Sequence, residues 1–300
     1  MTVLVNVIVI LGMLYVVPAG LRLIDPAGLR RTARLWSLPA ALGAVSLWLP
    51  RGGAATALAA LYAAACLALA ARAPAALLRG GTPGPAEVAV ATALASPAVA
   101  GTALVAERAG HRLFGFDLDI LALTVPHFHF AGFTAALVAG LVCRAAAPGP
   151  GARWAAYSVP AGTLLVLLGY FVDDWAELAG AVVLTGGMWA VALTTWREIR
   201  PAGRDRTTRA LLAVSAAVLG ATMLLALWWA AGEATGIPHP TLTWMAATHG
   251  LGNALGFALC SVLAWRRLTA DHPPTAGRSR TAEHPRAADH PQTARQETTP

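Results

Sequence analysis

The sequence predicts an all-α protein, a polytopic bundle of transmembrane helices, and three observations point to that class. Apolar residues form 57% of the 300 residues, charged residues form only 12%, and the mean hydropathy is +0.59. Soluble domains contain about 45–50% apolar and about 25% charged residues, so an ordinary soluble fold is excluded. The apolar residues also gather in long runs that lack the alternation of strands. Because lipid offers backbone groups no hydrogen-bond partners, these runs predict helices.

Nine runs approach the roughly 20 residues that a membrane-spanning helix needs. In chain order they cover residues 2–21, 35–50, 54–71, 86–106, 118–143, 154–172, 175–196, 210–231 and 241–265. The second run is short and contains Pro39, so the bundle has seven spans if the second and third runs do not cross. The bundle is expected to fill residues 1–265. Residues 266–300 are rich in Pro, Thr and Arg and are expected to form a disordered cytoplasmic tail.

The arginines predict how the bundle lies in the membrane. All 22 basic residues are Arg, and with nine spans 19 of them fall on one side and 3 on the other. Basic residues collect on the cytoplasmic side of membrane proteins, which predicts an outer N-terminus and an inner C-terminus. The same distribution accounts for the net charge of +7. No platform of basic and aromatic residues is present for nucleic acid, so the expected partner is the lipid bilayer.

Two histidines inside the fifth run are the first candidates for function, because a polar side chain at depth is costly unless it is paired. His127 and His129 follow Pro126 and lie about 14–17 Å from the outer start of the run, at 1.5 Å per residue. Residues two apart are about 200° apart around a regular helix, so the two imidazoles cannot share a face. Either the helix is distorted near Pro126, or one imidazole faces the interior and the other a neighbouring helix.

A second polar patch lies in the ninth run, where His249 and Asn253 are four residues apart and share a helix face. His249 is about eight residues from the outer start of its run, and His127 is about nine from the start of the fifth. The two patches are therefore predicted at one depth, which favours a single intramembrane site. The alternative is structural, with His and Asn linking helices by hydrogen bonds.

Acids on the predicted outer side supply candidate proton donors. Glu177 lies about one turn inside the seventh run and four residues after Asp173, and Asp119 begins the fifth run. A partly buried acid beside another acid can donate a proton at neutral pH. The alternative is that these acids are solvated loop residues. The three intramembrane histidines with an acid would suit zinc, but no His-Glu-x-x-His motif is present, so neither a metal nor a cofactor is expected.

Two segments carry a family resemblance. Residues 127–133 (HFHFAGF) and 249–257 (HGLGNALGF) resemble the YndJ-like family of bacterial integral membrane proteins, and the resemblance extends from about the third to the ninth predicted helix. Some members of that family carry a transporter label. One branch, from actinobacterial natural-product clusters, is similar to membrane-bound terpene cyclases of indolosesquiterpenoid and meroterpenoid biosynthesis. The resemblance implies a multi-pass protein of a bacterial cell membrane.

The leading hypothesis is a membrane-integral terpene cyclase that protonates a prenyl or epoxyprenyl chain, with a lipophilic prenylated small molecule as its partner. Asp119, Glu177 or a protonated His would be the acid, and His129 or His249 the base, oriented by Asn253. Aromatic faces would stabilise cationic intermediates. The catalytic candidates are Asp119, His127, His129, Glu177, His249 and Asn253, and the pocket candidates are Phe128, Phe130, Phe133, Trp189 and Phe257, with Trp189 expected in the interior.

The alternative hypothesis is a proton-coupled transporter, because intramembrane histidines and acids also form proton relays. Transporters commonly consist of repeated halves, whereas nine spans do not divide into two halves and the sequence contains no detectable repeat. This second hypothesis is therefore the weaker one.

Overall fold

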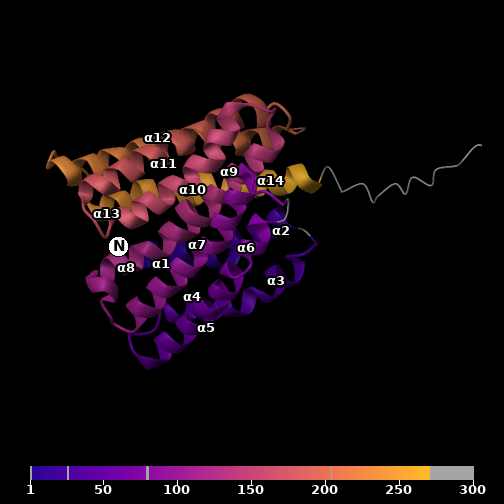
Figure 1. Cartoon of the computed structure of the whole chain (residues 1–300). Coiled ribbons are helices and arrows are strands. Elements are labelled where there is room, and N and C mark those ends of the chain that lie inside the picture. Colours follow the sequence, from indigo (N-terminus) through magenta and orange to yellow (C-terminus); the bar gives the residue numbers. More distant parts are fainter. Residues whose placement is uncertain (1, 26, 79–80, 204, 271–300) are drawn as a thin grey trace, which may run out of the picture.

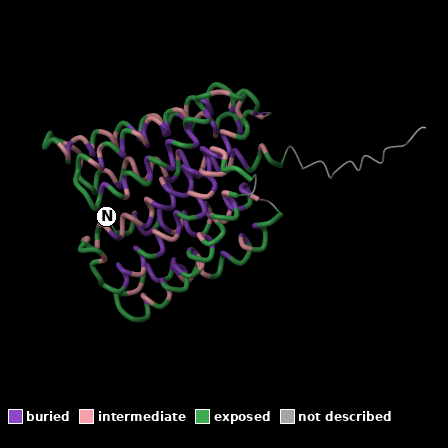
Figure 2. Tube along the Cα trace, in the orientation of Figure 1, coloured by how far each residue is buried: buried purple, intermediate pink, exposed green. Residues whose placement is uncertain are grey.

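The computed structural model describes residues 2–25, 27–78, 81–203 and 205–270, and within these residues every regular element is a helix. Figure 1 shows the helices running side by side between two ends of one bundle. Buried residues follow the middle of the bundle and exposed residues its outside (Figure 2). The predicted all-α class is confirmed.

The helical elements follow one another along the chain from the N-terminus. They are α1 (Thr2–Leu11), η1 (Gly12–Val16), α2 (Val17–Ile24), α3 (Arg30–Leu35), α4 (Ser37–Ser46), α5 (Gly53–Ala70), α6 (Ala73–Leu77), α7 (Pro85–Arg108), η2 (Leu113–Gly115), α8 (Leu118–His127), η3 (Phe128–Thr134), α9 (Ala135–Ala145), α10 (Pro150–Gly169), α11 (Asp174–Thr194), η4 (Thr195–Ile199), α12 (Arg206–Thr235), α13 (Leu242–Met245), η5 (Ala246–Gly250), η6 (Gly252–Leu259) and α14 (Cys260–Ala270). Of the η elements, η2 is a 3₁₀-helix and the others are π-helices.

Seven continuous helical segments of the described chain are long and apolar enough to cross a membrane. They are Thr2–Ile24, Gly53–Leu77, Pro85–Arg108, Leu118–Ala145, Asp174–Ile199, Arg206–Thr235 and Leu242–Ala270. The predicted fallback to seven spans was wrong about which runs fall short. The third run qualifies, whereas the second and sixth do not, because α3 and α4 are short and α10 is less apolar.

The two remaining runs nevertheless carry the chain between the same two ends. The backbone N–H of Gly52, just after α4, donates to the carbonyl of Arg108 at the end of α7 over 3.0 Å. The pair α3–α4 therefore returns the chain to the end where α7 finishes. Helix α10 packs along α11 and joins α9 to it in the same way. Described residues thus make nine passes, as expected from the nine runs.

The two ends of the bundle differ in charge. We call the end with the loops at 47–52, 109–117, 170–173 and 236–241 the outer end, following the predicted orientation. Among the described arginines it holds three, Arg51, Arg108 and Arg112, and the other described arginines lie at the inner end. Two of the outer arginines are paired with the buried acid Glu107, and the Arg108 guanidinium also donates to the carbonyls of Ser46 and Leu49. This ion cluster fastens the end of α4 and the loop before α5 to α7.

Helices α10 and α11 approach unusually closely because glycines face the partner backbone. A Cβ at Gly162 would lie 2.5 Å from the Leu184 Cα, and a Cβ at Gly180 would lie 2.5 Å from the Val166 N. Small residues at such contacts are typical of membrane helices, where close packing replaces the hydrophobic effect as the driving force. This contact fixes α11, which carries Glu177.

We expect Gly180→Ala to destabilise the folded protein by about 1–3 kcal/mol, because backbone atoms of α10 cannot yield to the added methyl group. The measurement is thermal unfolding of the purified protein in detergent. Gly186→Ala on the same helix is the control, since nothing lies within 4 Å of its added Cβ. Equal melting temperatures for the two variants would contradict the close contact.

The inner end joins α12 to α14 through a capped helix start. Asp205 accepts hydrogen bonds from the Thr208 backbone N–H at 2.9 Å and from the Thr208 hydroxyl at 2.7 Å, and its carboxylate lies 3.3 Å from the Arg267 guanidinium. Helix α14 continues to Ala270, five residues beyond the predicted boundary at 265. The remainder of the expected tail, residues 271–300, lies outside the described residues.

The two hydrogen bonds from Thr208 lower the pKa of Asp205, and the charge of Arg267 lowers it further, to about 2. A carboxyl whose pKa falls on folding stabilises the folded state above its unfolded pKa, about 3.9, and loses that contribution as the pH falls towards 2. We expect Asp205→Ala to lower the melting temperature at pH 6, with the difference from the native chain shrinking below pH 4. A pH-independent difference would contradict this.

Candidate functional site

One cavity of about 580 Å³ lies in the outer half of the bundle. Its walls come from α1, α7, α8 and η3 on one side and from α11, α12, α13 and the π-helices after α13 on the other. Most of the lining is aliphatic or aromatic. The side chains with polar atoms are Thr102, Thr124, His127, Tyr170, Glu177, Trp229, His249 and Asn253. An apolar cavity with a few polar groups is the usual form of a small-molecule site.

The cavity brings together seven of the eleven residues that the sequence singled out. They are His127, Phe128, Phe130, Glu177, His249, Asn253 and Phe257. The two polar patches predicted at one depth thus line one cavity. The imidazoles of His127 and His249 are also close enough to interact electrostatically.

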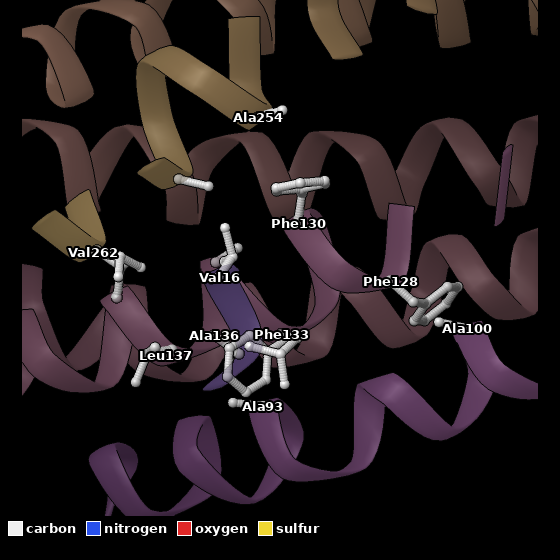
Figure 3. Packing of buried hydrophobic residues seen from close by; sticks show 14 of the residues in the cluster. Val16, Ala93, Ala100, Phe128, Phe130, Phe133, Ala136, Leu137, Ala254 and Val262 are labelled. Carbon is white, nitrogen blue, oxygen red and sulfur yellow. The ribbon is translucent and has the colours of Figure 1, made fainter. Parts of the chain in front are cut away.

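The other four predicted residues lie outside the cavity, and the structure gives a physical reason for the position of each. Asp119 is exposed in the first turn of α8, where the helix dipole favours an acid. Trp189 is 41% exposed rather than interior, and its indole N–H donates to the Gly220 carbonyl over 3.2 Å. Phe133 is fully buried against Gly20, among the core residues of Figure 3. The fourth, His129, faces a neighbouring helix.

His129 is fully buried and its Nε2 lies 2.5 Å from the Tyr62 hydroxyl of α5. The ring of Tyr62 packs edge-on against Trp36, with ring centroids 5.7 Å apart. Both alternatives predicted for the histidine pair therefore hold. The helix is distorted, because η3 begins directly after His127, and the two imidazoles point to different places. The predicted role of His129 as the base in the cavity is corrected, because His129 does not line the cavity and lies against Tyr62 instead.

His249 is held by a short hydrogen-bond network with α12. Its Nδ1 donates to the Thr222 carbonyl over 2.8 Å, and its Nε2 accepts from the Asn253 amide over 3.1 Å. The Asn253 carbonyl oxygen accepts in turn from the Thr222 hydroxyl over 2.8 Å. Asn253 orients His249 as expected, but it also occupies the nitrogen that a base would use. His249 is consequently a neutral, fully bonded group in the cavity wall.

His127 is the imidazole that remains available. It is half-buried in the cavity wall, packs edge-on against Phe128 with ring centroids 5.5 Å apart, and makes no hydrogen bond with another described residue. Phe128 and Phe130, on either side of His129, point to opposite sides of η3 (Figure 3). A ligand in the cavity could therefore reach a ring nitrogen of His127 without displacing a protein partner.

Glu177 marks the outer part of the cavity. Its side chain is 8% exposed, and its carboxyl interacts with the Tyr170 hydroxyl and with the acids Asp174 and Glu233. Aromatic rings surround this part, with the Phe116 centroid 6.3 Å from Tyr170 and 5.4 Å from Phe171. The acid and the free imidazole thus belong to one cavity but to different elements, α11 and α8.

The sequence pattern of the YndJ-like protein family matches residues 7–257, most of the chain and both segments that carry the resemblance. This chain belongs to the YndJ-like family. Neither the curated proteins nor the solved structures contain a match to it. The family match, together with the seven long apolar helical segments of the described chain, makes this YndJ-like chain a multi-pass membrane protein.

Four outer-site residues of this YndJ-like protein were not singled out from the sequence, namely Phe116, Tyr170, Phe171 and Trp229. Phe116 comes from a predicted loop, Tyr170 and Phe171 from the end of the sixth run, and Trp229 from the end of the eighth. The sequence does show these aromatic residues at or near the ends of predicted helices, and that clustering was a possible signal of a site. Those positions also suit membrane-interface residues, so composition could not distinguish the two roles.

Wide π-helical turns surround the cavity. His129 lies in η3, His249 in η5 and Asn253 in η6, and η1 places Gly12 directly against the His129 side chain. Side chains donate to carbonyls inside these turns, as the Thr134 hydroxyl does to His129 over 2.8 Å. Inserted π-turns occur frequently at functional sites. Among the described residues no three His, Cys, Asp or Glu side chains converge to hold a metal ion.

We expect the two cavity histidines to differ in their effect on stability. His249→Ala removes two hydrogen bonds inside the bundle, the one to the Thr222 carbonyl and the one from the Asn253 amide, and should lower the free energy of unfolding by about 1–3 kcal/mol. His127→Ala removes no hydrogen bond and should change it by less than about 0.5 kcal/mol. Thermal and denaturant unfolding in detergent measure both. A His127→Ala variant as unstable as His249→Ala would show that His127 is structural.

Proposed function

We propose that this YndJ-like protein is a membrane-integral terpene cyclase that starts ring formation by protonating a prenyl or epoxyprenyl chain in natural-product biosynthesis. The observation that carries the proposal is the cavity itself, which is apolar and aromatic and presents one acid, Glu177, and one unbonded imidazole, His127. Cyclisation of a polyene needs an acid, a dry pocket and a base. Each of these has a candidate in the same cavity.

Glu177 is the proposed general acid. A carboxyl among apolar groups and other acids favours its neutral form, and a neutral carboxylic acid can protonate an epoxide oxygen or an alkene. The Tyr170 hydroxyl, which interacts with the Glu177 carboxyl, would orient it. The proton forms a new O–H or C–H bond, and the positive charge passes to carbon.

The aromatic lining would hold the chain folded while that charge moves. Phe130 and Phe257 line the cavity near the imidazoles, and Phe116 and Trp229 line its outer part. Ring faces attract cations by about 0.5–2 kcal/mol each, most strongly where water is excluded. An apolar lining that excludes water would also protect a carbocation from being trapped as an alcohol.

His127 is the proposed base that ends the reaction. It would take a proton from the carbon next to the final cation, so that a C–H bond breaks and an alkene forms. Product and substrate then have the same mass. His249, whose nitrogens are both engaged, supplies a fixed polar wall rather than a proton acceptor. The lipophilic substrate would enter from the lipid of a bacterial cell membrane.

The test uses membranes that contain the protein and supplies them with prenyl- and epoxyprenyl-bearing aromatic substrates. Chromatography with mass detection then shows whether isomeric products form. We expect a product of unchanged mass and shifted retention. Glu177→Gln and His127→Ala should each lower the rate by about 10²–10⁴-fold, because each removes a proton-transfer group.

Asp119→Asn is the matched control, since this exposed acid lies outside the cavity and should leave the rate unchanged. Absence of any isomer from every prenylated substrate would refute the proposal. Proton-coupled flux across vesicles that is lost in His127→Ala would instead favour a transporter, for which intramembrane histidines are equally suited.

A further inference from the structure

Four aromatic residues from two outer loops pack together at one edge of the cavity, and all four line it. Phe114 and Phe116 belong to the loop 109–117, and Tyr170 and Phe171 to the loop 170–173. The Phe171 ring packs edge-on against Phe114, with ring centroids 5.5 Å apart, and against Phe116, with centroids 5.4 Å apart. Phe116 also packs edge-on against Tyr170, with centroids 6.3 Å apart. We call these four residues the aromatic mouth.

The cavity reaches the surface of the bundle at the aromatic mouth. Phe114 is 75% exposed and Phe171 is 54% exposed, although both line the cavity. Aromatic side chains at helix ends lie in the interface between lipid and water. Trp175, in the first turn of α11, is such an interface residue and no more, since it is 61% exposed and does not line the cavity.

The two loops of the mouth meet through their rings alone. Each loop has hydrogen bonds of its own, from the Phe116 N–H to the Leu113 carbonyl over 3.1 Å and from the Phe171 N–H to the Leu168 carbonyl over 3.0 Å. No hydrogen bond or ion pair between described residues joins one loop to the other. The loops can therefore separate without the loss of a polar contact.

The loop 170–173 is the fixed side of the mouth. A Cβ at Gly169 would lie 2.5 Å from the Glu177 N, so the backbones of α10 and α11 are in contact directly beside Tyr170. Asp173 accepts a hydrogen bond from the Ala176 N–H over 2.7 Å and so caps the start of α11. A separation of the two loops would therefore move the loop 109–117.

Phe114 is the strained residue of that loop. Its φ of 54° is left-handed, as are the φ values of Gly110 and Gly115 on either side, and no other non-glycine residue of the described chain has a positive φ. Bulky side chains rarely adopt this conformation, and such strain gathers at ligand sites and switch regions. The strained backbone holds the Phe114 ring against Phe171, where it is exposed rather than packed into the core.

We propose that the aromatic mouth is a gated entry site for an apolar chain, which passes from the outer leaflet of the bilayer between Phe114 and Phe171 into the cavity. The inference rests on the proposed cyclase function, whose substrate is a prenyl chain dissolved in lipid. Aromatic rings offer such a chain dispersion contacts and no full charge, and the nearby Arg112 and Asp117 are paired with each other. Return of the Phe114 ring behind the chain would close the cavity to water.

Photolabelling of the full-length protein in lipid vesicles tests the mouth, with farnesol that carries a diazirine as the probe. Mass spectrometry then measures the label on the peptides that contain the cavity residues Met223 and Phe257. Phe114→Gly should label these peptides severalfold faster, because glycine keeps the left-handed conformation while the ring is removed. Trp175→Ala is the matched control and should label them at the native rate.

A cross-link across the mouth provides the opposite change. In the Phe114→Cys/Phe171→Cys double variant, a short bis-methanethiosulfonate reagent joins the two loops, and reduction releases them. The cavity label should fall about tenfold or more in the joined state, because the open state is no longer populated, and should recover on reduction. Each single Cys variant, treated with the same reagent, is the control. Native labelling of the joined protein, or a native rate in Phe114→Gly, would overturn the proposal.

Labelling requires no catalysis, so the mouth and the cyclase function can fail separately. A protein that forms no isomer but shows both labelling changes keeps the mouth and loses the cyclase. An active cyclase whose joined variant converts prenylated substrates at the native rate keeps the cyclase and loses the mouth. Absence of label from the cavity of the native protein also refutes the mouth.

Discussion

The structure depends on one constraint, that a backbone carbonyl inside lipid must find a donor within the protein. A π-turn shifts the register of the helix and disturbs the regular pairing of its carbonyls. In this bundle side chains supply donors there. The Trp36 indole N–H bonds the Met13 carbonyl of η1 over 2.9 Å, and the Thr163 hydroxyl lies 3.4 Å from the Ala131 carbonyl of η3. Wide turns are thereby tolerated at the depth where the cavity lies.

These turns decide which polar groups are committed and which remain available. The turn at η3 directs His129 to Tyr62, and the turns at η5 and η6 set His249 and Asn253 against Thr222. Every hydrogen bond formed in this way stabilises the bundle and removes a reactive nitrogen from the cavity. His127, one residue before η3, escapes this arrangement. That His127 remains without a hydrogen bond in the cavity wall is therefore a consequence of where the wide turn begins.

The sequence was sufficient for the class, the passes of the chain and the depth of the two polar patches, because hydropathy and arginine distribution report on lipid directly. The sequence could not predict towards which neighbour each side chain points from its helix. The regular helical step, which places His127 and His129 about 200° apart, says nothing about which one faces the cavity. The π-turn that settles this has no simple sequence signature. Asp119 and Trp189 were misplaced for a related reason, since depth along a helix does not define a face.

The cavity also has a polarity that follows from its construction. Its deep wall holds the hydrogen-bonded pair His249 and Asn253 and the unbonded imidazole of His127, while its outer wall holds the acid Glu177 among aromatic rings. A neutral polar wall can accept a proton or bind a hydroxyl group but attracts no anion. The acids gather where loops reach water, and apolar side chains line the space between them and the deep wall. An apolar ligand with one protonatable end is the chemistry that such an arrangement fits, and a charged solute would find no compensating charge at the deep end.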